Sequence, residues 1–85
     1  MTEQAQQIVD FILNEIIRRP GTTIEEKTPL VSSGLIDSLA LVDILIKLED
    51  VTGMRIPAGK VQAKDMDTVE QMFVTAQRVG KPRAR

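Results

Sequence analysis

The chain has 85 residues, 11 basic and 12 acidic side chains, and a net charge of -1. This length allows one small domain, and so balanced a charge gives no general field that would attract nucleic acid or a membrane surface. Because cysteine and histidine are both absent, disulfides, thiolate zinc sites and histidine-dependent triads and dyads are excluded. Asp, Glu, Lys and Ser remain, so composition alone does not exclude an enzyme, but we expect a monomer that does little chemistry alone and is not an enzyme.

The first predicted element is a helix over residues 3–18, with Thr2 as its N-cap. Pro20 and Gly21 end it. The residues that follow helical spacing are Ile8, Phe11, Ile12, Glu15 and Ile16, and Val9 and Leu13 widen the apolar face.

A long connection over residues 20–36 follows this helix and is rich in the turn formers proline, glycine, serine and threonine. A loop of this length is unusual in a small domain and is often functional. Its apolar anchors indicate that it packs across the bundle. They are Ile24, Leu30, Leu35 and Ile36.

A second helix is predicted over residues 38–51, with Asp37 as its N-cap. One apolar stripe consists of Leu41, Ile44, Leu45 and Leu48, and another consists of Leu39, Val42 and Ile46. A helix that is apolar on more than one side is either fully buried or presents one stripe to a partner. Because full burial is hard to arrange in so small a domain, we expect an exposed stripe.

The remaining elements are a short helix from Pro57 to about Ala63 and a last helix over residues 67–79, capped by Asp67 or Asp65. The inner face of the last helix consists of Val69, Met72, Phe73 and Ala76. With no strand pattern, the sequence predicts an all-α four-helix bundle, with three main helices, one short helix and a long loop between helices 1 and 2. The domain spans residues 1–80, and residues 81–85 form a disordered basic tail.

The candidate functional residue is Ser38, the first helical residue after its cap. Its hydroxyl is expected at a helix N-terminus, at the end of a loop, where it faces solvent. A phosphate ester on this oxygen would meet free N–H groups and the positive end of the helix dipole. Taken alone, however, Asp37 and Ser38 are also a common way to begin a helix.

The surrounding motifs resemble the acyl and peptidyl carrier protein family over nearly the whole chain. They are Thr28-Pro29-Leu30, Gly34, Asp37-Ser38-Leu39, Leu48-Glu49, Ile56-Pro57 and Asp67-Thr68-Val69. The resemblance implies that a separate phosphopantetheinyl transferase attaches 4′-phosphopantetheine from coenzyme A to Ser38. It also implies that Asp37 helps the transferase bind metal or orient Ser38.

In such a carrier the cofactor supplies the thiol, and the protein positions it. The resemblance implies an acyl or aminoacyl group held as a thioester and presented to partner enzymes of fatty acid or secondary metabolite biosynthesis. These partners are an acyl- or aminoacyl-activating ligase and an acyltransferase or condensing enzyme. The candidate docking residues are Leu39, Val42, Ile46 and Ile56, with an ordinary core role left open for Val42 and Ile46.

Two departures distinguish the chain from central fatty-acid carriers. Its second helix is less acidic, and Arg55, Lys60 and Lys64 stand in the following segment, where those carriers are acidic. Gly34 stands four residues before Ser38 rather than three. This form is similar to free-standing carriers of specialised acyl or aminoacyl pathways, which we therefore favour.

Two other functions are compatible with parts of the sequence. A helical interaction module without a covalent cofactor would use the exposed stripe of the second helix. DNA binding through residues 38–63 needs clustered basic side chains, whereas acidic ones line this region. Asp65 and Asp67 are too few and wrongly spaced for a calcium loop, so no metal site is predicted.

The chain is expected to be cytoplasmic and not inserted in a membrane. Its N-terminus is polar and lacks the features of a secretory signal. Its densest apolar stretch, residues 39–48, is interrupted by Asp43 and Lys47 and falls short of the roughly 20 apolar residues that span a bilayer.

Overall fold

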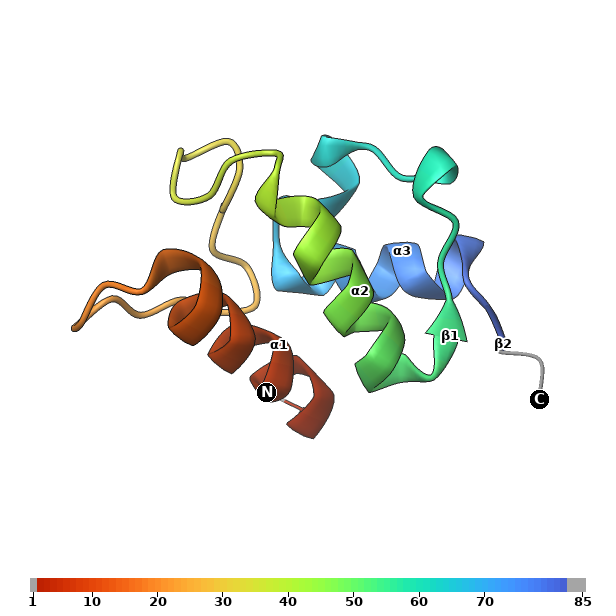
Figure 1. The fold of residues 1–85 in the computed structure, drawn as a ribbon, viewed down its shortest axis with the longest axis horizontal. Coiled ribbons are helices and arrows are strands. Elements are labelled where there is room, and N and C mark those ends of the chain that lie inside the picture. Colours follow the sequence, from red (N-terminus) through yellow and green to blue (C-terminus); the bar gives the residue numbers. More distant parts are fainter. Residues whose placement is uncertain (1, 83–85) are drawn as a thin grey trace.

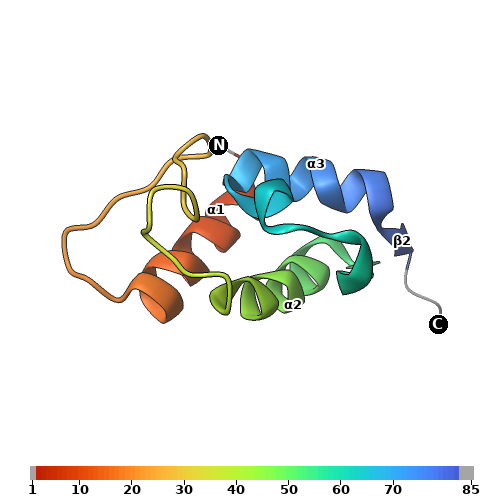
Figure 2. The ribbon, with the colours of Figure 1, turned by 90° about the horizontal axis from the view of Figure 1, so that it is seen from above.

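The structure is a computed structural model that describes residues 2–82, and it is mainly helical within them. The α-helices are α1 (Glu3–Phe11), α2 (Ala40–Thr52) and α3 (Val69–Val79). Helices α1, α2 and α3 pack against one another, and α3 crosses behind α2 in the view of Figure 1 and lies above α2 in that of Figure 2. The long loop between α1 and α2 closes one end of the molecule (Figure 1).

Helix α1 starts as predicted, because the Thr2 hydroxyl oxygen accepts a hydrogen bond from the Ala5 amide at 3.1 Å. It continues into a π-helical segment, η1 (Ile12–Ile17), which ends at Arg18 in the left-handed conformation with φ 58°. The predicted extent of residues 3–18 is therefore close to the observed one. The last turns are wound more widely than those of an α-helix. The sequence does not predict this, because apolar spacing over so few residues does not separate an α-helix from a π-helix.

Helix α2 begins at Ala40 rather than residue 38, because Ser38 and Leu39 form a turn that leads into it. It ends at Gly53, which has φ 70° and so supplies the left-handed residue that commonly closes a helix. Of the predicted stripe of Leu41, Ile44, Leu45 and Leu48, the last three are buried, and Leu41 is half-buried against the core.

The short helix expected over residues 57–63 is not an α-helix. The segment forms two 3-10 turns instead, η2 (Ala58–Lys60) and η3 (Ala63–Met66). In η3 the Gln62 amide donates a hydrogen bond to the Asp65 carboxylate at 3.0 Å. The fold is thus three α-helices with a 3-10 connection.

Helix α3 begins two residues later than predicted, and its N-cap is neither Asp65 nor Asp67. The Thr68 hydroxyl oxygen accepts the capping hydrogen bond from the Gln71 amide at 3.0 Å. Asp67 is unavailable as a cap because its carboxylate is bonded to the long loop. Asp65 is unavailable because it belongs to η3.

Two short strands, β1 (Met54–Arg55) and β2 (Lys81–Pro82), pair antiparallel and were not predicted. Gly80 permits this return of the chain, since a Cβ there would collide with the Ala76 carbonyl oxygen and the Met54 methyl group. The tail expected from residue 81 therefore starts in a paired strand. Residues 83–85 lie outside the described residues.

One aliphatic core joins the three helices and the loop. It contains Ile8 and Ile12 of the first helical segment and Met72 of α3, all fully buried. The loop anchors Ile24, Leu30 and Ile36 are buried as expected, but Leu35 is 37% exposed. Among residues 2–82, no helix is long and apolar enough to cross a membrane.

Candidate functional site

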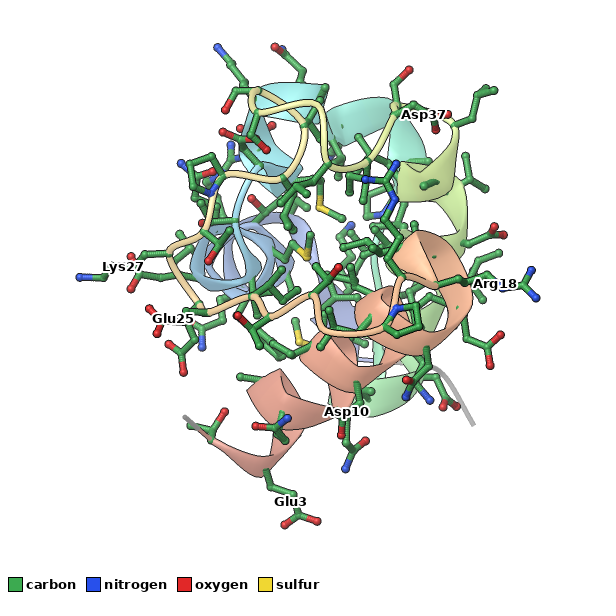
Figure 3. The ribbon with its side chains drawn as sticks, turned by 90° about the vertical axis from the view of Figure 1, so that its left-hand side faces the viewer. Glu3, Asp10, Arg18, Glu25, Lys27 and Asp37 are labelled. Carbon is green, nitrogen blue, oxygen red and sulfur yellow. The ribbon has the colours of Figure 1, made fainter. Side chains whose placement is uncertain are left out.

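Ser38 lies where the long loop enters α2. The Asp37 carboxylate accepts a hydrogen bond from the Ala40 amide at 3.0 Å, and the Ser38 carbonyl accepts one from the Leu41 amide at 3.3 Å. These bonds order the first turn, so Asp37 does cap the entry to the helix although the regular α-helix starts later. Figure 3 shows Asp37 at the end of the loop, on the outer edge of the molecule.

The three serines of the chain differ in how their hydroxyl groups are engaged. The Ser32 hydroxyl donates to the Asp67 carboxylate at 2.8 Å, and the Ser33 hydroxyl donates to the Pro29 carbonyl at 2.6 Å. Ser38 is exposed, and its hydroxyl has no hydrogen-bond partner among residues 2–82. All three serines are exposed, so Ser38 differs from the other two in having a hydroxyl that is free of hydrogen bonds within these residues.

The surroundings of Ser38 fit a phosphate ester with an organic arm. The hydroxyl lies on the first turn before α2, where backbone N–H groups and the helix dipole favour an anion. An open groove of about 240 Å³ starts at Ser38 and passes between α2 and the 3-10 segments. Its walls are mostly apolar, with Leu41, Val42, Ala58 and Val61 among them.

The predicted apolar stripe of α2 is solvent-exposed. Leu39 is 80% exposed, Val42 62% and Ile46 59%. The core role that was open for Val42 and Ile46 is therefore wrong. A row of exposed aliphatic side chains that begins next to Ser38 is suited to contact with another protein.

Ile56 was predicted on the same surface, and this prediction is wrong. Its side chain is only 3% exposed and packs in the core. Its amide donates a hydrogen bond of 2.8 Å to the Glu49 carboxylate, which draws the start of the 3-10 connection onto α2. Ile56 is therefore a structural residue.

The loop before Ser38 is fastened to the start of α3 by Asp67. One carboxylate oxygen, Oδ1, accepts hydrogen bonds from the amides of Val31 and Ser32, both at 2.8 Å, and the Asp67 carbonyl accepts one from Leu30 at 2.8 Å. The hydrogen bond from the Ser32 amide is the main reason that the pKa of Asp67 is lower than usual. The sequence predicts a helix cap at Asp67 and places it in the Asp67-Thr68-Val69 motif, but it does not predict this bonding to the loop.

The electrostatic surroundings are mixed. Asp43 and Asp50 are exposed on α2, and Lys47 of the same helix lies 5.9 Å above the centre of the Phe11 ring. Lys60 and Lys64 of the 3-10 segments are exposed and line a separate hollow. Within the described residues, 2–82, no group of three or more carboxylates could hold a metal ion.

Comparison with known proteins identifies the family. The family model described as a phosphopantetheine attachment site matches residues 7–72, which include the loop, Ser38, α2 and most of the core. A search of curated proteins gives no match, and neither does a search of solved structures.

Members of this family carry 4′-phosphopantetheine as an attached prosthetic group and are generally not catalytic themselves. They interact with phosphopantetheinyl transferases and with biosynthetic enzymes. When bound, the group supplies a thiol that can hold cargo as a thioester. The described part of the chain has no cysteine and so no thiol of its own. With its family model matched over most of its length, the chain belongs to the phosphopantetheine attachment site family and is a carrier protein for 4′-phosphopantetheine.

Proposed function

We propose that Ser38 is the attachment residue and that the chain carries an acyl or aminoacyl group as a thioester on the attached arm. The observation that carries this proposal is the free, exposed hydroxyl of Ser38 on the first turn before α2. Ser32 and Ser33 compete poorly, since each hydroxyl already donates a hydrogen bond of 2.8 Å or less.

The roles of the neighbouring residues follow from their positions. Asp37 holds the turn and stands beside the hydroxyl that a transferase must approach. Leu39, Val42 and Ile46 form a docking stripe, defined here as the exposed side chains of Leu39, just before α2, and of Val42 and Ile46 on α2. Partner enzymes are a phosphopantetheinyl transferase, an activating ligase, and an acyltransferase or condensing enzyme.

The cargo we propose belongs to a specialised pathway rather than to central fatty-acid synthesis. The 3-10 segments that form the wall of the groove opposite α2 also contain the exposed residues Lys60 and Lys64, which line a separate hollow, so the surface of these segments is not uniformly acidic. Electrostatic complementarity steers association and partner choice. Partners adapted to this chain would therefore carry acidic groups opposite this segment.

The test of attachment is modification by a phosphopantetheinyl transferase with coenzyme A and magnesium, followed by proteolysis and mass mapping. The proposal predicts one modified peptide, with the added group on Ser38. A group on Ser32 or Ser33 would overturn the assignment of the residue. A cofactor-free interaction module, the alternative function, would remain unmodified and would bind its partner equally well after Ser38→Ala.

A further inference from the structure

We propose that Asp67 is a positioning residue for the modification of Ser38, acting through the long loop and without contact with the reacting groups. The inference rests on the proposed function, since it concerns how Ser38 is presented to the transferase. Asp67 lies 29 positions after Ser38 in the sequence, and it holds the loop that leads to Ser38.

The carboxylate makes an unusually complete contact with this loop. Its Oδ1 accepts from the amides of Val31 and Ser32, and its Oδ2 accepts from the Ser32 hydroxyl, all at 2.8 Å. Hydrogen bonds to an ionised acceptor are shorter and stronger than those between neutral groups. One side chain therefore fixes two consecutive loop residues against the start of α3.

The fastened residues are connected to Ser38 by a short, ordered path. The Ile36 amide donates to the Leu30 carbonyl at 3.1 Å, which closes the turn that contains Gly34 at φ 81°. Ile36 is buried, and the next residue is Asp37, whose carboxylate caps the turn of Ser38. The turn is closed at its ends by Leu30 and Ile36, and Asp67 holds Val31 and Ser32 within it. A change at Asp67 is therefore transmitted through this turn to the place from which the chain enters α2.

Backbone bonds support the same junction without replacing the side chain. Leu30 donates to the Asp67 carbonyl, and Glu70 donates to the Glu26 carbonyl at 3.0 Å. These bonds keep the loop near α3 when the carboxylate is removed, so the expected result is a loosened loop and not an unfolded chain. Loosening lowers the fraction of molecules in which Ser38 is correctly presented, and the apparent affinity for the transferase falls by that fraction.

The experiment measures transferase kinetics on the full chain with Asp67→Ala, Asp67→Asn and Thr68→Ala. Thr68→Ala is the matched control, because it removes the N-cap of the same helix without touching the loop. Amide hydrogen exchange on the same proteins reports the loop independently of the transferase. The Asn variant keeps an acceptor oxygen for both loop amides, so it should restore most of what Ala loses.

For Asp67→Ala we expect a rise of about fivefold in KM for the chain, with kcat within about twofold of wild type. In Asp67→Ala the amides of Val31 and Ser32 should exchange hydrogen faster than in wild type. In Thr68→Ala the Gln71 amide should exchange faster, and KM should stay near the wild-type value. Equal KM values for Asp67→Ala and wild type, or an equal rise in Thr68→Ala, would overturn the inference.

The two proposals fail in distinguishable ways. If wild type is modified at Ser38 and Asp67→Ala behaves identically, the positioning role is wrong and the carrier assignment stands. If wild type is not modified at Ser38, the attachment proposal is wrong, and the positioning role falls with it even where the exchange data show a loosened loop.

Discussion

The Asp37 carboxylate accepts a hydrogen bond from the Ala40 amide at 3.0 Å, across the turn that contains Ser38. This bond fixes the turn while the Ser38 side chain remains exposed. Asp37→Ala should therefore lower the free energy of unfolding by about 1 kcal/mol, the usual effect of losing a cap. Urea titration measures this loss, and Asp37→Asn, which keeps a capping oxygen, should recover most of it.

The same substitutions separate the structural role of Asp37 from a role toward the transferase. If the carboxylate also assists the transferase, Asp37→Asn should regain stability but remain a poor substrate. Equal recovery of stability and of modification rate in Asp37→Asn would limit Asp37 to capping.

Leu39→Asp should impair partner contact far more than stability. The side chain is 80% exposed, so folding buries little of it, and a charge there costs the folded state little. Partner-dependent transfer should fall at least about tenfold, as expected when an anchor of an interface loses more than about 1.4 kcal/mol of binding. Urea titration and a loading assay on the same preparation measure the two effects.

Val74→Asp is the control for this prediction. Val74 is also an exposed aliphatic residue, at 57%, but it lies on α3 and outside the docking stripe. It should leave both stability and transfer near wild type. A parallel loss of stability and transfer in Leu39→Asp would place Leu39 in the folded core and contradict its docking role.

Ile56→Ala should lower stability far more than partner contact, the reverse of Leu39→Asp. Truncating this buried side chain removes apolar contacts and leaves a cavity, at a cost of about 2 to 4 kcal/mol. The variant should still be modified at Ser38 under conditions in which it is folded. Unchanged stability with impaired transfer would restore Ile56 to the docking surface.

Acid should weaken the attachment of the loop through Asp67. Because the folded state holds the pKa of Asp67 below the ordinary value of 3.8, the carboxylate stabilises the fold above that value. The contribution is lost as the pH falls through the lower, folded-state pKa. Asp67→Asn cannot titrate, so between these two values its stability should change less steeply with pH than that of wild type. Equal slopes would contradict the bonding described here.

The helices could be predicted because apolar spacing reports a local property. In α2 the same periodicity separates Leu45 and Leu48, which are buried, from Val42 and Ile46, which are exposed. A small domain has room to cover only one of these faces. The structure accordingly agrees with the expectation of an exposed stripe.

The errors concern residues whose surroundings depend on distant parts of the chain. Ile56 is an isolated apolar residue in a connection, so no periodicity indicates which way it faces. Asp67 resembles a helix cap in sequence, but its bonding partners, Val31 and Ser32, lie more than 30 positions away. The pairing of β1 with β2 likewise depends on the closure of the fold, because two-residue strands have no alternation to detect.

The most direct measurement is the intact mass of the wild-type chain and of Ser38→Ala after incubation with coenzyme A, magnesium and a broad-specificity phosphopantetheinyl transferase. Melting curves of both proteins should nearly coincide, which excludes unfolding as the cause of any difference. The account predicts that wild type gains one phosphopantetheine and Ser38→Ala gains none. A gain in folded Ser38→Ala, or no gain in wild type with several transferases, would contradict it.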